Sequence, residues 1–370
     1  MENKNSNKAS RRNFVKQSSL VGIALSTSFI STSCNESKAK PEIKELGKLN
    51  ENSKKLLSTF NIKYPFFQAA PGGEELAVAI AKSGGMGAMQ FWGSSPESVY
   101  EASVRLSERT NGKFYANYVL HWPPETIANA LKGGCRNFQF SWGLPSREVV
   151  QLIKDADAKF GIQVTSKLNA LKALSLDPDF MICQGIEAGG HVQGTSSIKK
   201  VLPEIIEASG DVPILVSGGI STGHDIRKAI NTGAAGVVMG SRFVATVEGN
   251  HHQIYKQSLV DADENSTVYT NCFNNGGWHA MHRVLRNSTF QTWEAAGCPL
   301  IGDKPGEDDI LSKSESGREI KRYAINSPKK GMTGDIEALV LYAGEGVSKI
   351  QDIPKAEDLI VRLWNEFENK

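Results

Sequence analysis

The sequence predicts a (β/α)₈ barrel, in which eight parallel strands alternate with helices, followed by a mostly helical capping extension. From about Tyr64 onward, short apolar runs of strand length alternate with amphipathic stretches of helix length. Two of the later runs each lead into a glycine-containing loop. A doubly wound sheet, the alternative, would typically carry a G-x-G-x-x-G turn after its first strand, and this sequence has none.

Each element of this prediction comes from a local pattern. Strands are predicted where a short apolar run is bounded by glycine or polar residues, and helices where apolar residues recur on one face. The predicted strands are Phe66–Ala69, Gly87–Gln90, Phe114–Val119, Asn137–Ser141, Gln163–Thr165, Phe180–Cys183, Pro213–Ser217 and Gly236–Met239. The predicted helices include Glu74–Ser83, Pro96–Arg109, Ser146–Phe160, Ile198–Ser209 and His224–Thr232.

The alternation stops after the eighth unit. We therefore assign residues 61–263 to the barrel and residues 264–370 to an extension that caps its mouth. Within the extension, Leu285–Ala296 and Ala356–Asn369 have helical patterns, whereas Pro299–Gly317 is charged and rich in glycine.

Composition excludes several classes of protein. The chain has 370 residues, 22% of them charged, and a formal net charge of +2, which does not indicate a nucleic-acid-binding surface. The five cysteines form no C-x-x-C pair, so neither a zinc cluster nor a redox dithiol is indicated, and no metal site is expected. Cys135 and Cys183 lie in apolar runs and are expected in the core. Cys272 and Cys298 could pair in an oxidising compartment, and the sequence leaves this open.

The N-terminus resembles an export signal. Arg11 and Arg12 precede a modestly apolar stretch from Leu20 to Ile30, a pattern similar to a twin-arginine signal, and Cys34 is a candidate for lipidation. We assign residues 1–34 to this signal and residues 35–60 to a tether; a disordered basic tail is the alternative. The expected location is the periplasm, free or as a lipoprotein anchored on the periplasmic side. The twin-arginine export machinery moves folded proteins, which suits an enzyme with an organic cofactor.

His191 is the candidate catalytic residue. It closes the segment Gln184-Gly185-Ile186-Glu187-Ala188-Gly189-Gly190-His191, which follows the buried strand Phe180–Cys183. Enzymes with this fold carry their acid–base groups on loops at the carboxyl ends of the strands. The alternative is a histidine that only forms hydrogen bonds within its loop.

Two loops predict a phosphate site. Gly218 and Gly219 follow the seventh predicted strand, and Gly240 and Ser241 follow the eighth. In barrels, these two loops commonly bind phosphate through backbone N–H groups, because glycine lets the backbone approach closely. A tight turn without a ligand is the alternative. Arg242 could assist or could pair with a carboxylate of the barrel.

Together these segments resemble the nitronate monooxygenase family, which are FMN-dependent TIM barrels. The intact Gln184–His191 segment is the most specific match, and Ser141-Trp142-Gly143-Leu144-Pro145 and Tyr342–Gly346 are further echoes. The opening strand departs from the family's P-x-x-Q-A-P-M-x-G because it has an inserted alanine and lacks the methionine.

The resemblance implies roles for individual residues. His191 would be the catalytic base. The flavin FMN would be hydrogen-bonded by Gln184, with its ring lined by Ala69 and Asn117. The residues expected to complete the cofactor site are Gly189, Gly218, Gly219, Gly240 and Ser241.

The resemblance also implies an activity, namely oxidation of small alkyl nitronates or nitroalkanes by O₂ to a carbonyl compound and nitrite. The partners would be O₂ and a small acidic carbon compound, with no nucleic acid. A base with a pKa near neutrality suits removal of the acidic α-proton. The alternatives are an NAD(P)H-dependent enoyl-acyl carrier protein or quinone reductase of the same fold, and a non-catalytic flavin-binding envelope protein.

Overall fold

The computed structural model describes residues 48–369. The predicted export signal, Cys34 and the first part of the predicted tether lie outside the described residues. Within residues 48–369, no helix is long and apolar enough to cross a membrane.

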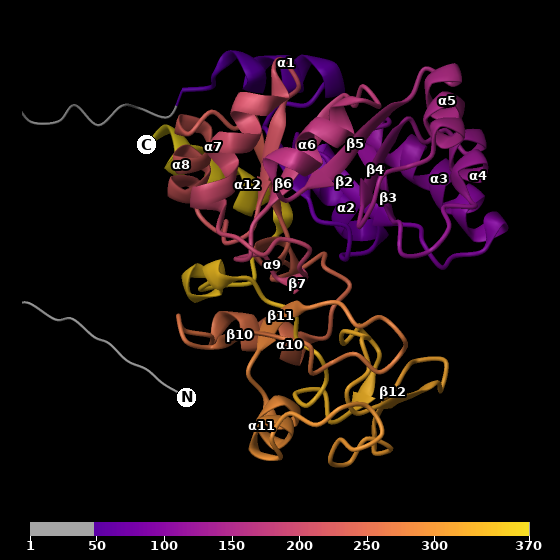
Figure 1. Cartoon of the computed structure of the whole chain (residues 1–370), viewed down its shortest axis with the longest axis vertical. Helices are drawn as coiled ribbons and strands as arrows, with labels where there is room; N and C mark the ends of the chain where they lie inside the picture. Colours follow the sequence, from indigo (N-terminus) through magenta and orange to yellow (C-terminus); the bar gives the residue numbers. More distant parts are fainter. Residues whose placement is uncertain (1–47, 370) are drawn as a thin grey trace, which may run out of the picture. The chain divides into compact units, whose positions relative to one another are not determined.

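Eight parallel strands form the centre of the fold (Figure 1), which confirms the (β/α)₈ prediction. They are β1 (Phe66–Gln68), β2 (Gly87–Gln90), β3 (Phe114–Val119), β4 (Asn137–Ser141), β5 (Lys159–Val164), β6 (Phe180–Gln184), β8 (Ile214–Ser217) and β9 (Gly236–Met239). Their order is β1-β9-β8-β6-β5-β4-β3-β2. A parallel bridge between Phe67 on β1 and Met86, next to β2, joins the two ends of this order, so the barrel is nearly closed.

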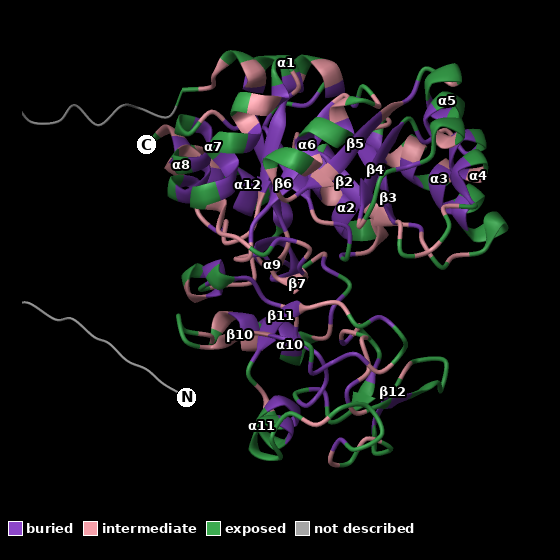
Figure 2. Cartoon of the chain, in the orientation of Figure 1, coloured by how far each residue is buried: buried purple, intermediate pink, exposed green. Residues whose placement is uncertain are grey.

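Helices cover the outside of the barrel. In Figure 2 the strands are buried while the outer faces of the helices are exposed. Serine side chains cap several helices by accepting a backbone N–H at the third helical position, as Ser95, Ser146 and Ser166 do. The helices of this outer layer are α2 (Glu74–Lys82), α3 (Pro96–Thr110), α4 (Ile127–Lys132), α5 (Arg147–Asp155), α6 (Lys167–Leu174), α7 (Ile198–Ser209) and α8 (Gly223–Asn231).

The sequence placed one helix–strand boundary too late. The predicted helix Ser146–Phe160 ends at Asp155, and β5 begins at Lys159 rather than at Gln163. Asp157 has a positive φ of 50°, which ends the helix and turns the chain into the strand.

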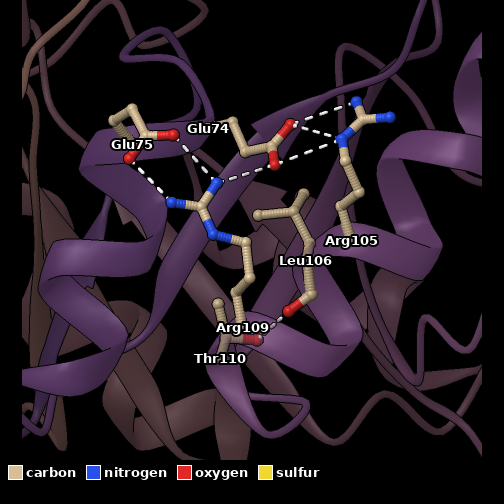
Figure 3. Close-up of polar contacts among 6 residues, drawn as sticks. All are labelled: Glu74, Glu75, Arg105, Leu106, Arg109 and Thr110. Atoms are coloured by element: carbon tan, nitrogen blue, oxygen red, sulfur yellow. Dashed lines mark hydrogen bonds and ion pairs between the residues drawn. The ribbon is translucent and has the colours of Figure 1, made fainter.

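Ion pairs join two neighbouring helices of the outer layer (Figure 3). Glu74 and Glu75 lie in the first turn of α2, where carboxylates interact favourably with the helix dipole. Arg109 on α3 contacts Glu74 at 2.9 Å and Glu75 at 2.7 Å, and Arg105 contacts Glu74 at 3.1 Å. The hydrogen bond from Arg109 lowers the pKa of Glu75. Because Arg105 and Glu75 are exposed, their pairs fix helix orientation more than they add stability.

A further helix, α1 (Glu51–Phe60), forms the last part of the predicted tether, residues 35–60. That part of the tether prediction is wrong, because α1 packs into the barrel interior. Leu56 is fully buried, and the Phe60 ring lies 5.6 Å from Phe67 and 5.4 Å from Phe180. Apolar side chains of β1 and β6, which are separated by β9 and β8 in the barrel, thus share a contact with α1.

We expect Leu56→Ala to lower the free energy of unfolding by about 2–5 kcal/mol, because it opens a cavity in a fully buried cluster. Leu57→Ala removes the same atoms from a partly exposed position, so it should cost less than about 2 kcal/mol. Urea unfolding of both variants measures the difference. Equal losses would contradict the packing of α1 into the barrel.

The extension differs from the mostly helical one predicted. Besides helix α11 (Ser288–Ala295) and the 3₁₀ helix η1 (Glu345–Lys349), it consists of strands and irregular segments. One sheet pairs β10 (Thr267–Thr270) with β11 (His282–Leu285), and β11 with β7 (Gly190–His191). The other contains β12 (Ile310–Lys313), β13 (Glu319–Lys321) and β14 (Thr333–Gly334). Short helices α9 (Ser241–Val244) and α10 (Gln253–Val260) lead into it from β9.

The last helix, α12 (Ala356–Glu368), belongs to the barrel although the sequence placed it in the extension. Leu359, Ile360 and Leu363 are buried in the main core cluster together with residues of α2 and α8. Arg227 on α8 donates a hydrogen bond to the carbonyl of Phe367. In Figure 1 α12 accordingly lies beside α8. The capping segment is therefore an insertion between β9 and the final barrel helix.

Candidate active site

A cavity of about 890 Å³ lies where the carboxyl ends of the strands meet the inserted segment. This is the end at which barrels place their active sites, and the volume is typical of a cofactor or ligand site. All the site residues predicted from the sequence line this one cavity. They are Ala69, Asn117, Gln184, Gly189, His191, Gly218, Gly219, Gly240 and Ser241.

His191 is held by two parts of the fold. Its loop follows β6, and its backbone pairs as β7 with β11, so that His191 lies opposite His282. The N–H of Val192 donates to the carbonyl of Met281 at 2.9 Å. An antiparallel pair of this kind fixes the direction of both side chains.

The imidazole of His191 lies among aromatic rings. Trp278 stacks on it with centroids 3.8 Å apart and an interplanar angle of 20°, and the rings of His282 and Tyr342 lie 5.4 Å and 5.5 Å away. The Nε2 atom of His191 is buried and has no hydrogen-bond partner among the described residues. It is therefore free to accept a hydrogen bond or proton from a ligand in the cavity.

The sequence predicts a pKa near neutrality for His191. In the structure this pKa is much lower. Burial, with a smaller contribution from the nearby His282, lowers it to about 3. Desolvation disfavours the charged imidazolium, so His191 is neutral at pH 7. A bound anion would favour the protonated form, since an opposite charge nearby raises the pKa of a base.

His282 provides a prediction on pH and stability. It is fully buried, and burial lowers its pKa to about 4. The unfolded chain, with an ordinary histidine pKa of about 6.5, binds the proton first, so stability should fall as the pH drops from about 6.5 to about 4. Removing this group should therefore make the protein less sensitive to acid, by on the order of 1–3 kcal/mol over that range.

The variant His282→Asn tests this, since asparagine can still accept from the N–H of Phe273 and donate to the carbonyl of Ala280. Urea unfolding between pH 4.5 and pH 7.5 measures the slope for both proteins. His279→Asn, which replaces a histidine with no such buried contacts, serves as control. Parallel curves for wild type and His282→Asn would contradict the prediction.

Gln184 organises the loop that carries His191. Its Oε1 accepts from the N–H of Gln193 at 2.7 Å, and its Nε2 donates to the carbonyl of His191 at 3.3 Å. The Glu187 carboxylate accepts from the N–H of Ile198 at 3.1 Å and thus caps α7. The polar residues of the glycine-rich segment therefore place the histidine. The Gln184 amide keeps one N–H for a ligand.

A row of five uncharged amides lines the cavity, and three of them, Gln90, Gln139 and Gln163, were not predicted from the sequence. Gln90, Asn117 and Gln139 are directly opposite one another on β2, β3 and β4. Gln163 on β5 donates to Gln184 on β6 at 3.3 Å. All five line the cavity. Each is a polar residue at or near the carboxyl end of an apolar strand, and this position could have identified them from the sequence.

The glycine loops form a cradle at the other end of the cavity. Gly218 and Gly219 have φ values of 125° and 69°, which other residues rarely adopt. A Cβ built on Gly240 would meet only the Cβ of Ala69, at 3.6 Å, so a side chain there would project into the cavity. The hydroxyl of Ser241 accepts from the N–H of Gly344 at 3.0 Å and keeps its own proton to donate. These donors fit a phosphate group.

The segment Tyr342–Gly346 closes over this cradle. A Cβ on Gly189 would lie 2.5 Å from the nitrogen of Gly344, and one on Gly346 would lie 2.5 Å from the carbonyl oxygen of Gly219. Gly189 therefore lines the cavity but is needed mainly for close packing of this segment.

Several secondary candidates have structural roles. Arg242 is buried and contacts Asp352 at 3.2 Å, so it pairs with a carboxylate rather than serving the cavity. His282 lies on strand β11 and is buried there. Cys135 and Cys183 are buried, which confirms their assignment to the core. Cys272 and Cys298 are free thiols.

A barrel with a neutral amide row and a glycine cradle at the carboxyl ends of its strands suits a flavin-dependent oxidoreductase. The family model described as nitronate monooxygenase matches residues 124–366. The chain belongs to the nitronate monooxygenase family.

Curated relatives include a nitronate monooxygenase, and solved structures share the fold. The chain is 23% identical to a nitronate monooxygenase of Pseudomonas aeruginosa, over 80% of this chain and 94% of that protein. It is 25% identical to a 5-hydroxy-7a-methyl-1-oxo-octahydro-1H-indene-4-carboxyl-CoA dehydrogenase of Mycobacterium tuberculosis, over 82% of this chain and 93% of that protein. FabK from Thermotoga maritima has the same fold, with a TM-score of 0.72, 23% identity, and coverage of 85% of this chain and 96% of that one. A nitroalkane oxidase from Streptomyces ansochromogenes superposes with a TM-score of 0.69 and 21% identity, covering 85% and 98%.

Proposed function

We propose that this protein binds FMN and oxidises alkyl nitronates with O₂ to a carbonyl compound and nitrite, with His191 adjacent to the substrate. The observation that supports this most directly is the unpartnered, buried Nε2 of His191 in the cavity that also contains the amide row and the glycine cradle. Family membership supports nitronate oxidation in general.

The residues present fit FMN. The cradle of Gly218, Gly219, Gly240 and Ser241 would hold its phosphate, and the amides of Asn117 and Gln184 would face the donors and acceptors of its ring. When bound, FMN supplies the redox chemistry, accepting electrons from the substrate and passing them to O₂.

The chain's own residues bind the substrate and accept its proton. The neutral His191 accepts the α-proton of a nitroalkane through Nε2. The resulting imidazolium then pairs with the nitronate anion, which offsets the desolvation that otherwise keeps the pKa of His191 low. Trp278, stacked on the ring, excludes water from one face of the imidazole.

Purification without added cofactor tests the proposal. We expect a yellow protein whose visible spectrum shows flavin, which releases FMN on denaturation and consumes O₂ with ethylnitronate. Oxidation of NADH without nitronate would instead favour a reductase of the same fold. A colourless protein that FMN cannot reconstitute would contradict the assignment.

The proposed reaction agrees with the proposed location. It needs only substrate, flavin and O₂, whereas the reductases need NAD(P)H and, in one case, an acyl carrier protein. We propose export through the twin-arginine route, which the sequence around Arg11 and Arg12 supports. Cell fractionation with an antibody against the folded protein tests it.

A further inference from the structure

Four of the six tryptophans of this chain gather at the mouth of the cavity. Trp92, Trp122 and Trp142 follow three successive strands, β2, β3 and β4, and Trp278 belongs to the inserted segment. Trp278 lies in the middle, with its ring centroid 5.2 Å from Trp122 and 5.0 Å from Trp142, both edge-to-face. Flat surfaces from four separate segments therefore meet beside His191.

The tryptophans form a wall in two layers. Trp92, Trp142 and Trp278 line the cavity directly. Trp122 lies behind them and stacks on Trp92 with centroids 4.2 Å apart and an interplanar angle of 4°. A ring supported in this way has little rotational freedom left to lose when a ligand packs against it.

Trp142 is held in an unfavourable backbone conformation. Its φ of 64° lies in the left-handed region, which bulky residues rarely adopt. Its N–H donates to Oε1 of Gln193 at 3.0 Å, and this bond ties it to the loop that carries His191. Backbone strain of this kind persists where surrounding contacts enforce it and is frequent at ligand sites.

The charge of the cavity decides which ligands this wall suits. Aromatic walls bind either cations or other flat rings. The inserted segment contributes three cationic lining residues, Arg318, Lys329 and Lys330, against Glu315, the one carboxylate among the lining residues. Within the described part of the chain, Lys329 has no carboxylate within ion-pair distance, and its nitrogen lies 3.1 Å from Nε2 of His251. This excess of positive charge disfavours a cationic ligand.

We propose that the tryptophans form a subsite for a flat aromatic ring, so that the preferred substrates are nitronates bearing an aryl group close to the reacting carbon. The inference rests on the proposed nitronate oxidation and deepens it by naming the substrate class. The ring packs against Trp92 and Trp142, and Trp278, which stacks on His191, holds the imidazole beside the nitronate. The cationic residues complement the negative charge of the substrate.

Two preformed nitronates test the subsite by turnover on the flavin-loaded enzyme. Those of phenylnitromethane and cyclohexylnitromethane have the same carbon skeleton and differ in flatness. We expect Trp92→Leu to lower the phenyl-to-cyclohexyl ratio of kcat/KM by about two- to tenfold relative to wild type. Trp364→Leu, on α12 and outside the cavity, should leave that ratio unchanged. A ratio equal in wild type and Trp92→Leu would overturn the proposal.

A binding experiment separates this inference from the proposed reaction. Phenylacetate and cyclohexylacetate are unreactive anions, and calorimetry on the flavin-loaded protein should show tighter binding of phenylacetate, with a preference that Trp92→Leu weakens. If this preference appears without any nitronate turnover, the subsite stands and the proposed reaction fails. Equal affinity for the two acids, or tighter binding of benzyltrimethylammonium than of phenylacetate, would overturn the subsite.

Discussion

Gly240→Leu should give a folded protein that is purified without flavin. Gly240 has φ −105° and ψ −82°, so leucine meets no left-handed strain there. A Cβ at this position lies near only Ala69, and the rest of the leucine side chain would extend into the cavity. We expect FMN affinity to fall about ten- to a hundredfold, because the leucine side chain would occupy space that the bound cofactor needs.

The measurement is the visible absorbance per protein, followed by titration with FMN. Gly240→Ala adds only one carbon, 3.6 Å from Ala69 Cβ, and should retain most of the flavin. Thermal unfolding of the flavin-free forms checks that both variants fold equally well. Stoichiometric flavin in Gly240→Leu would show that the cofactor phosphate does not lie in this cradle.

His191→Ala should reduce turnover of a neutral nitroalkane by about 10²- to 10⁴-fold, the usual contribution of a general base. The preformed nitronate needs no proton removed, so its turnover should fall less than about tenfold. That smaller loss reflects the missing positive charge beside the anion. Oxygen consumption with nitroethane and with ethylnitronate at one pH gives both numbers.

Two further variants sharpen this test. His191→Asn keeps a hydrogen-bonding group of similar size without the basicity or the positive charge, so it should resemble His191→Ala on nitroethane and should lose no more than His191→Ala on ethylnitronate. His224→Ala removes an exposed histidine on α8 and should change neither rate. Equal losses on the two substrates in His191→Ala would show that His191 is not the base.

The barrel was predictable because each of its strands and helices has a recognisable pattern within its own short stretch of sequence. Gly87–Gln90, Phe114–Val119 and Asn137–Ser141 have the predicted bounds, since each is a short apolar run ended by glycine or polar residues. The role of α1 was not predictable from its polar composition, because three buried residues suffice to anchor it. That α12 packs in the barrel was not predictable for another reason. A long insertion separates it from β9, and nothing local marks an interrupted barrel.

The site was predictable in part for the same reason. The residues of the glycine-rich segment and of the two glycine loops are close in sequence to the strands that position them, and all of them line the cavity. Trp278 and His282 come from the insertion, and their contact with His191 depends on a strand pairing across about ninety residues. The low pKa of His191 follows from that pairing, so no local pattern could indicate it.

The pairing of β7 with β11 has a consequence for how substrate entry could be observed. The amide hydrogen of Val192 is bonded to Met281, so it can exchange with solvent only when the inserted segment separates from the barrel. Its exchange rate therefore reports the opening of the active site, on the same peptide that carries His191. Slower exchange with a bound aryl acid would indicate that ligands hold the two parts together, and unchanged exchange would indicate that they enter without such opening.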